Sequence, residues 1–447
     1  VWFRNARSAC YRVPVPDRSE RKRQSSLDHV VTTQTERRLT LRDYDIVLFG
    51  ATGFTGCLVA EYLQEVYGNG EDLSWAIAGR SEEKLRRVAA DIGAPDTPII
   101  IADSSDPAAL AAMANSTTVV CTTVGPYALY GSELVKACVD AGTHYCDLTG
   151  EVHWMHDMIQ RHQEQARASG ARIVHTCGFD SIPSDLGTLF LQEAMLAQHG
   201  VPAEQVKLRV NRFSGAFSGG TVASMINMME QAGKDSSVRK VMADPYALLP
   251  EGAPRGSDRN DQTSAIYDED FERWTLPFVM AAINTRVVRR SNALMDFAYG
   301  EQFRYDEAML APAKQGMVTS KLAGLAMTAG SASLVVPPLR AVAKRFLPSP
   351  GEGPSKEQRE KGFYDIYLYG VHPEDRDLDL VARVTGDRDP GYGSTSKMLA
   401  ESAICLARDD LACEGGFWTP ASAMGQVLIE RLEDSAGLTF TLESDLP

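Results

Sequence analysis

Short apolar runs alternate with stretches of helical periodicity from Tyr44 to about residue 200. Nearly continuous apolar runs separated by helices are typical of parallel strands that are covered on both faces. The runs predict six strands: DIVLFG (45–50), SWAIAG (74–79), PIIIAD (98–103), TTVVCTTV (117–124), HYCDLTG (144–150) and ARIVHTCG (171–178). Helices are expected between them at 54–67, 81–92, 107–114, 131–141, 153–169 and 183–198. The pattern therefore predicts an α/β fold with a doubly wound parallel sheet.

This alternation ends near residue 200. The segments 363–372 and 378–387 predict an antiparallel pair, because apolar and polar residues roughly alternate along them. Other expected elements are a strand at 206–213 and helices at 218–233, 392–409 and 421–436. A chain of 447 residues is too long for one simple core. We expect a doubly wound domain at 44–200, a second mixed α/β domain at 201–390, and C-terminal helices at 391–447 that can pack back on the first domain.

Charge is distributed unevenly along the chain. Residues 1–43 hold ten Lys and Arg against five Asp and Glu, which gives them a net charge of +5. The whole chain has a formal net charge of −14, so the remaining residues carry −19. Their composition predicts a disordered basic tail, with a transit peptide or a misassigned start as alternatives. An acidic main body argues against nucleic acid as a partner.

The cysteines and histidines give no signal of a metal site. None of the eight cysteines forms a CxxC pair, which disfavours zinc and dithiol chemistry and favours a reducing, cytoplasmic setting. His144, His153 and His175 lie within or beside strand ends, and we expect structural roles for them.

Three glycines follow the first strand in the sequence Gly50-Ala-Thr-Gly53-Phe-Thr-Gly56. Gly50 would permit a tight exit from the strand, Gly53 a close approach of a pyrophosphate, and Gly56 close packing of helix on sheet. The pyrophosphate would meet free N–H groups and the positive end of the helix. The sequence thus predicts a Rossmann dinucleotide site that includes Thr52, Phe54 and Thr55.

The end of the second strand indicates which dinucleotide binds. NAD-binding sites have an acidic residue here, whereas this chain has Arg80, with Lys84 one turn later. Arg80 can pair with a 2′-phosphate, so we expect NADP(H) rather than NAD(H). Asp103 closes the third strand and could reach the adenine amino group or cap the helix that begins near Pro107.

Several longer motifs identify a family. The same first loop occurs in extended short-chain dehydrogenases, but none of the fifteen tyrosines has Lys at i+4, as their chemistry requires. The chain instead resembles the saccharopine dehydrogenase-like oxidoreductases, and within them the trans-acting enoyl reductase branch. The segments that carry the resemblance are IVLFGATGFTG, AGR, TTVGPYALYG, THYCDLTGE, GFDSIPSD, SGGT (218–221), GYGSTSKM (391–398) and GGFWTPASAMG (415–425). The resemblance implies an NAD(P)-type cofactor and, in this branch, reduction of a polyketide-derived double bond in glycolipid synthesis.

Reduction of a conjugated double bond requires a proton donor beside the hydride donor. Val124, Gly125 and Pro126 end the fourth strand, where the nicotinamide ribose would pass. The candidate acids near this point are Tyr127, which we favour, Glu151 and Asp180. Core packing is the alternative role for the tyrosine, and capping of the next helix is the alternative for Asp180.

Basic and apolar residues bear on the substrate. Saccharopine carries three carboxylates, and Arg209, Arg212 and Arg286 could clamp them in a saccharopine-type amino-acid dehydrogenase. However, residues 322–339 contain no charge and are followed by Arg340, Lys344 and Arg345. This segment predicts a buried or substrate-lining helix, an interfacial membrane contact through 322–346, or, least of all, a spanning helix. We therefore expect a small hydrophobic substrate. A non-catalytic nucleotide-binding protein at a lipid surface is the third functional alternative. A homodimer is the oligomeric state to test.

Overall fold

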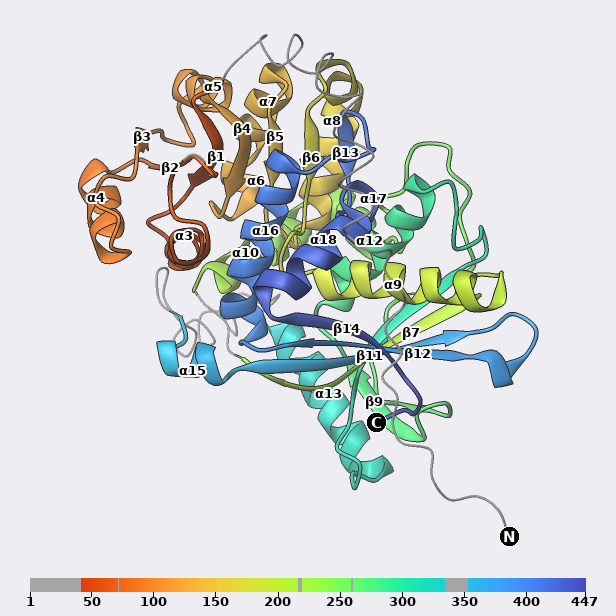
Figure 1. Cartoon of the computed structure of the whole chain (residues 1–447). Coiled ribbons are helices and arrows are strands. Elements are labelled where there is room, and N and C mark those ends of the chain that lie inside the picture. Colours follow the sequence, from red (N-terminus) through yellow and green to blue (C-terminus); the bar gives the residue numbers. More distant parts are fainter. Residues whose placement is uncertain (1–41, 71, 216–218, 259, 334–352) are drawn as a thin grey trace, which may run out of the picture.

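Two β-sheets organise the part of the chain that the computed structural model describes, which comprises residues 42–70, 72–215, 219–258, 260–333 and 353–447 (Figure 1). The expected N-terminal tail lies outside these ranges, except for its last two residues, and so do residues 334–339 at the end of the uncharged segment. Within the described ranges, no helix is long and apolar enough to cross a membrane.

Sheet A is parallel, with the strand order β13-β6-β5-β4-β1-β2-β3. Its strands are β1 (Tyr44–Phe49), β2 (Trp75–Gly79), β3 (Ile99–Ile101), β4 (Thr117–Thr122), β5 (His144–Cys146), β6 (Arg172–Val174) and β13 (Gly416–Trp418). The order reverses between β1 and β4. In doubly wound sheets a dinucleotide spans this switch point, with its adenine half over one side and its nicotinamide half over the other.

Helices cover both faces of sheet A because its strands are apolar on both sides. On β1, Ile46 and Leu48 belong to one core and Val47 and Phe49 to another. The first face carries α3 (Phe54–Val66) and α16 (Thr395–Arg408), and α4 (Glu82–Asp91) packs beside β2 and β3. The second face carries α5 (Pro107–Ser116), α7 (Ser132–Ala141) and α8 (Val152–Ser169). The short helix α6 (Tyr127–Tyr130) follows β4. This arrangement confirms the predicted doubly wound sheet.

Sheet B is mixed, with the order β14-β12-β11-β7-β10-β9-β8. Only its β7–β10 pair is parallel among the described pairings. Its strands are β7 (Gln205–Ser214), β8 (Ile266–Asp268), β9 (Arg273–Pro277), β10 (Arg304–Leu310), β11 (Phe363–Val371), β12 (Leu380–Gly386) and β14 (Leu438–Glu443). The antiparallel β11–β12 pair is the one that the sequence predicted.

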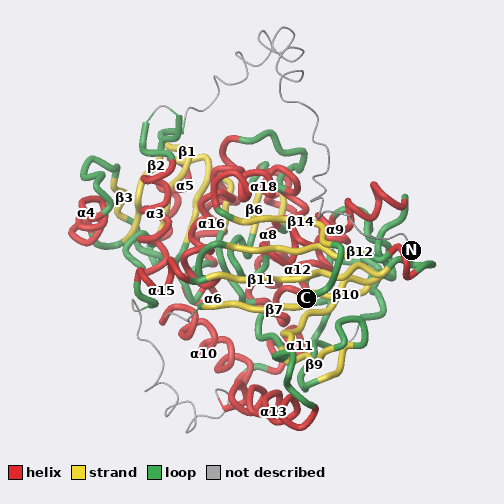
Figure 2. The backbone as a smooth tube through the Cα atoms, turned by 60° about the horizontal axis from the view of Figure 1, so that its bottom comes forward, coloured by secondary structure: helices red, strands yellow, loops and turns green. Residues whose placement is uncertain are grey.

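Several helices connect and cover the sheets. The helix α9 (Ile182–His199) lies along sheet B, packs on β11 and β12, and meets α12 (Ala281–Leu294), α17 (Pro420–Ala423) and α18 (Gly425–Arg431). Figure 1 shows α9 crossing sheet B on the side that faces sheet A. The helices α10 (Gly219–Lys234), α11 (Ser236–Ala243), α13 (Met317–Ser333) and α15 (Lys356–Lys361) lie toward the periphery (Figure 2).

The C-terminal segments differ in detail from the expectation. The helix expected at 392–409 is a π-turn, Pro390–Ser394, followed by α16, and the helix expected at 421–436 is divided into α17, α18 and the π-turn Leu432–Ala436. β13 was not predicted, because its three residues carry no periodic signal. It nevertheless extends sheet A by pairing with β6, while α16 packs on β1, β4 and β5.

Candidate active site

The glycine loop joins β1 to α3 at the carboxyl edge of sheet A. Gly50 has a positive φ of 94°, and a Cβ there would lie 2.7 Å from Cγ2 of Val124 at the end of β4. A Cβ on Gly56 would lie 2.2 Å from the carbonyl oxygen of Gly50. Both positions therefore require glycine, one for the backbone conformation and both for close packing.

The same loop leaves a cradle at the start of α3. A Cβ on Gly53 would meet only the Gly50 oxygen, at 3.3 Å, among the described residues, and Thr52 and Gly53 are exposed. Gly53 forms the N-cap without a side-chain hydrogen bond, so the N–H groups of Phe54 and Thr55 in the first turn have no intrahelical acceptor. Free N–H groups at a positive helix end with an uncrowded approach fit a dinucleotide pyrophosphate.

The adenosine side of the switch point carries the predicted cation. Arg80 is exposed at the end of β2, and Ser81 caps α4 by accepting the N–H of Lys84, whose side chain is also exposed. Asp103 does not cap α5, because Asp106 fills that position. Asp103 instead accepts hydrogen bonds from the N–H and hydroxyl of Ser105, which, with a weaker effect of the Arg80 charge, lower its pKa.

The nicotinamide side begins at the end of β4. Thr123 continues the pairing with β1 by donating its N–H to the Phe49 carbonyl at 3.0 Å, so Val124 and Gly125 lie beside the glycine loop. The helix α10 lies beside this corner: the Ser224 hydroxyl is 3.5 Å from where a Cβ on Gly125 would be, and Gln231 contacts His153 Nε2 at 3.0 Å. α10 is also next to α6 in both views (Figures 1 and 2).

Tyr127 follows Pro126 but points into the protein. Its side chain is 3% exposed and packs against Trp154, with 5.5 Å between ring centroids. The hydroxyl donates to the Thr122 carbonyl at 3.2 Å and accepts the N–H of Leu148 at 3.4 Å. Burial raises the pKa of this phenol well above its usual value. The hydroxyl thus holds the ends of β4 and β5 together.

Glu151 is also buried and fully engaged. Its carboxylate accepts the N–H groups of Tyr127 at 2.8 Å and Ala128 at 3.0 Å. Burial raises its pKa, and these two hydrogen bonds act in the opposite direction. The side chain caps α6 across the loop that follows β5.

Asp147 braces the next two loops beneath these residues. One carboxylate oxygen accepts the N–H groups of Thr149 and Thr176, and the other contacts the Tyr145 hydroxyl at 2.8 Å and His175 Nδ1 at 2.7 Å. Thr176 has a positive φ of 63°, which is rare for a β-branched residue and marks the sharp exit from β6. Asp147 and His175 therefore fix the loop that presents Asp180.

Asp180 is the candidate whose carboxylate is left available. It does not cap α9, since Ser181 occupies the N-cap. Its carboxylate lies 3.8 Å from a Cβ position on Gly150 and 3.1 Å from one on Gly178, between the β5 and β6 loops. No other described residue donates a hydrogen bond to it. Burial, with a further contribution from the charge of Asp147, raises the pKa of Asp180 to about 7.

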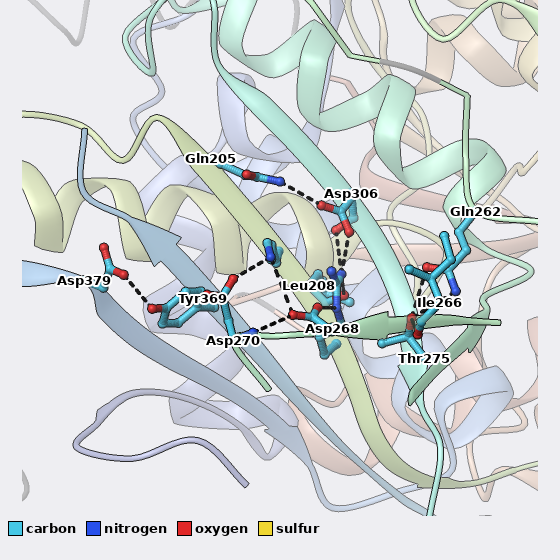
Figure 3. A network of polar contacts seen from close by, with 12 residues as sticks. Gln205, Leu208, Gln262, Ile266, Asp268, Asp270, Thr275, Asp306, Tyr369 and Asp379 are labelled. Atoms are coloured by element: carbon cyan, nitrogen blue, oxygen red, sulfur yellow. Dashed lines mark hydrogen bonds and ion pairs between the residues drawn. The ribbon is translucent and has the colours of Figure 1, made fainter. Parts of the chain in front are cut away.

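The three arginines considered as carboxylate clamps lie on β7 and α12, and two of them are paired with aspartates. Arg209 is buried on β7 and pairs with Asp268 at 2.8 Å and Asp306 at 2.6 Å, and Figure 3 shows both aspartates turned toward this point. Arg286 is buried on α12 and pairs with Asp261. Arg212 is largely exposed near the end of β7 and makes a longer contact with Asp365, at 3.6 Å.

Two segments from later in the chain also reach the carboxyl edge of sheet A. α10 reaches it from beyond residue 200, and the segment 387–395 reaches it from the far end of the chain, where Thr395 accepts the N–H of Phe179 at 2.9 Å beside Asp180. The motifs SGGT and GYGSTSKM mark these regions in the sequence. Their spatial position becomes visible only in the folded chain.

The glycine cradle, the switch point and Arg80 define the class of protein. Residues 46–174 match the family described as the saccharopine dehydrogenase NADP binding domain. The chain is therefore an NAD(P)-dependent oxidoreductase with an NADP-binding domain, and the expectation of NADP(H) is confirmed.

Full-length relatives identify the family more closely. The chain is 44% identical over 420 residues to a putative trans-acting enoyl reductase of Mycobacterium tuberculosis, covering 90% of this chain and 98% of that protein. It is 40% identical over 416 residues to the trans-acting enoyl reductase of Mycobacterium leprae, covering 89% and 97%. Apo saccharopine dehydrogenase (L-Glu forming) from Saccharomyces cerevisiae aligns with a TM-score of 0.49 at 12% identity, over 90% of this chain and 100% of that one. The chain belongs to the trans-acting enoyl reductase family.

Proposed function

We propose that this protein uses NADPH to reduce a carbon–carbon double bond conjugated to a carbonyl in a hydrophobic acyl or polyketide-like substrate. The observation that carries the proposal is the Asp180 carboxyl, which lies between the β5 and β6 loops on the nicotinamide side of the switch point, with a pKa of about 7 and no hydrogen-bond donor from another described residue. The names of the relatives support the same reaction class.

The proposed reaction divides the work between cofactor and protein. Hydride transfer to the β-carbon of the substrate is the chemistry that NADPH would supply when bound, with NADP+ as the other product. Asp180 donates its proton to the α-carbon, so the double bond gains two hydrogens and the carboxyl becomes a carboxylate. A proton from solvent restores the carboxyl before the next turnover. A donor whose pKa lies near the working pH suits this role.

The helix beside the end of β4 supports an apolar substrate. α10 passes over the end of β4 and carries Met225, Met228 and Met229, which are partly buried. Flexible methionine side chains adapt to apolar ligands of varied shape. A saccharopine-type substrate would need several free cations, whereas Arg209 and Arg286 are each paired with aspartate.

Product analysis tests the proposal directly. A long-chain trans-2-enoyl pantetheine thioester is incubated with NADPH deuterated at the transferable position of C4, and the product is analysed by mass spectrometry. We expect a saturated thioester with one deuterium at the β-carbon. Oxidation of NADPH with lysine and 2-oxoglutarate, but not with enoyl thioesters, would favour the saccharopine alternative. Tight NADPH binding without turnover of either substrate would favour a non-catalytic role.

We propose as a second function that α13 contacts a lipid surface. Val318, Leu322 and Leu325 are spaced along one helix face and are 65%, 61% and 66% exposed, with Lys314 and Lys321 nearby. An outward apolar face beside cations is suited to an interface with anionic lipids. We expect Leu322→Glu/Leu325→Glu to abolish co-sedimentation with vesicles that contain phosphatidylserine, whereas Leu196→Glu, at an exposed leucine of α9, should not. Equal loss in both variants, or no binding by the unmodified protein, would refute the contact.

A further inference from the structure

The second half of the chain is seated directly on the glycine loop. Phe54, the first residue of α3, packs edge-on against Tyr392 of the π-turn, with 5.2 Å between ring centroids. Gly353 approaches the same ring so closely that a Cβ there would lie 2.5 Å from it. The residue after the central glycine therefore holds a contact with residues some 300 to 340 positions further along the chain.

Arg359 of α15 completes this contact. Its guanidinium lies 5.5 Å from the centroid of the Phe54 ring, and one of its nitrogens donates to the Pro354 carbonyl at 2.8 Å. Figure 1 shows α15 below α3. The guanidinium is thus close to the first turn of α3, which is the part of the loop that a pyrophosphate would approach.

The positive charge of Arg359 is not neutralised by an ion pair within the described ranges of the chain. The acids nearest to it in sequence have other partners. Glu357 pairs with Lys361, and Glu360 contacts Lys356 and Arg388. Asp389 lies near enough for the Arg359 charge to act on its pKa, but it makes no ion pair with Arg359, and its carboxylate accepts the N–H groups of Tyr392 and Gly393. A partly buried arginine that forms no ion pair with a described carboxylate, beside a helix end suited to anions, can bind an anion itself.

We infer that Arg359 is a ligand of the cofactor pyrophosphate, which it binds from the side opposite the N–H groups of α3. The guanidinium fork can donate two parallel hydrogen bonds to phosphate oxygens while it keeps its contact with the Phe54 ring. The pyrophosphate would then lie between the two halves of the chain. Arg80 is a separate site, since it lies at the end of β2, where the 2′-phosphate is expected.

Binding measurements distinguish this role from simple packing, and they do not depend on the proposed substrate. Dissociation constants are measured by calorimetry for NADPH, for 2′-phospho-ADP-ribose, and for adenosine 2′-monophosphate, which lacks the pyrophosphate. We expect Arg359→Gln to weaken the first two ligands about tenfold, as for loss of a charge-assisted hydrogen bond, and to change the third less than twofold. Arg388→Gln, a neighbouring arginine that contacts Glu360, is the control and should change none of them.

A purely structural arginine would give another result. Equal weakening of all three ligands, or unchanged NADPH binding, would overturn the assignment. Arg359→Met keeps an apolar contact with Phe54 but has no charge, so it serves as the second variant if Arg359→Gln lowers the Tm. NADPH affinity that is normal in Arg359→Met would likewise overturn it. We also expect added salt to weaken NADPH binding more in the unmodified protein than in either variant.

Discussion

Charged side chains are removed from water in two regions of this molecule, and they are treated differently. On sheet B, Arg209 lies between Asp268 and Asp306, and Lys207 pairs with Asp270 at 2.5 Å (Figure 3). At the carboxyl edge of sheet A, Asp180 has no cation and no donor from another described residue. The first region satisfies its charges within the fold, whereas the second leaves one carboxyl without a donor from another described residue.

The difference indicates where chemistry is possible. A buried ion pair holds its members charged and in place, and removal of one partner is costly. A carboxyl without a partner instead takes up a proton, because burial raises its pKa. The predictions below test this contrast, beginning with the largest effect.

Asp180→Asn should lower kcat about a thousandfold, within the range for loss of a general acid, because the amide cannot deliver a proton. The folded protein should be as stable as before or more stable, since a partly buried carboxyl with a raised pKa is removed. Steady-state kinetics with the enoyl thioester and thermal unfolding measure both effects. Asp180→Glu, with the acid displaced, should recover part of the rate. Full activity of Asp180→Asn would assign the proton to another group.

Asp268→Asn should instead lower stability and leave turnover unchanged. It leaves the buried Arg209 with one carboxylate partner and should cost about 3 kcal/mol of unfolding free energy. NADPH affinity and kcat per folded molecule should stay unchanged. Arg304→Met, which breaks the exposed pair with Glu204, is the matched control and should cost less than about 0.5 kcal/mol. A loss of NADPH affinity in Asp268→Asn would show that the sheet B network serves the site.

The pH dependence of turnover should follow the raised pKa of Asp180. The protonated carboxyl is the active form, so kcat should be constant at low pH and fall about tenfold per unit above about pH 7. The stability of the folded protein should fall with pH in the same direction. The folded protein holds the Asp180 proton more tightly than the unfolded chain does, so the stabilisation from this proton is lost as pH rises through about 7. Rates measured at constant NADPH saturation check the profile. A rate that rises above pH 7 would contradict an acid in this position.

Sequence patterns predicted sheet A well because its strands and loops are local features. Three glycines, Arg80 and the acids after each strand can be read in order, and their strand ends meet at one edge of a parallel sheet. The burial and the hydrogen-bond partners of each acid could not be predicted in this way. The orientation of Tyr127 depends on contacts of its hydroxyl with Thr122, at the end of β4, and Leu148, in the loop after β5. The pKa of Asp180 depends on its burial and on Asp147 in that same loop. The contact of Arg359 with Phe54 joins positions about 300 residues apart, and no periodicity reports it.

Arg80→Ala should weaken NADPH about tenfold and leave NADH binding within twofold, since only NADPH has a 2′-phosphate to pair with the guanidinium. Calorimetric titration of both cofactors measures the ratio. Lys84→Ala, one turn into α4, should have a smaller effect in the same direction, because its ammonium lacks the planar fork. Equal weakening of both cofactors would place Arg80 against the adenine or the pyrophosphate instead.

Tyr127→Phe should leave turnover nearly unchanged although the residue lies close to the proposed site, and it therefore tests the contrast most sharply. The hydroxyl makes two long hydrogen bonds, to the Thr122 carbonyl and from the Leu148 N–H, and the side chain is buried. Its loss leaves one buried donor and one buried acceptor without partners, which should cost about 1 to 3 kcal/mol of unfolding free energy. The value of kcat should remain within threefold. If kcat instead fell a hundredfold while Asp180→Asn remained active, the tyrosine would be the proton donor, and the unpaired carboxyl would be a feature of cofactor or substrate binding.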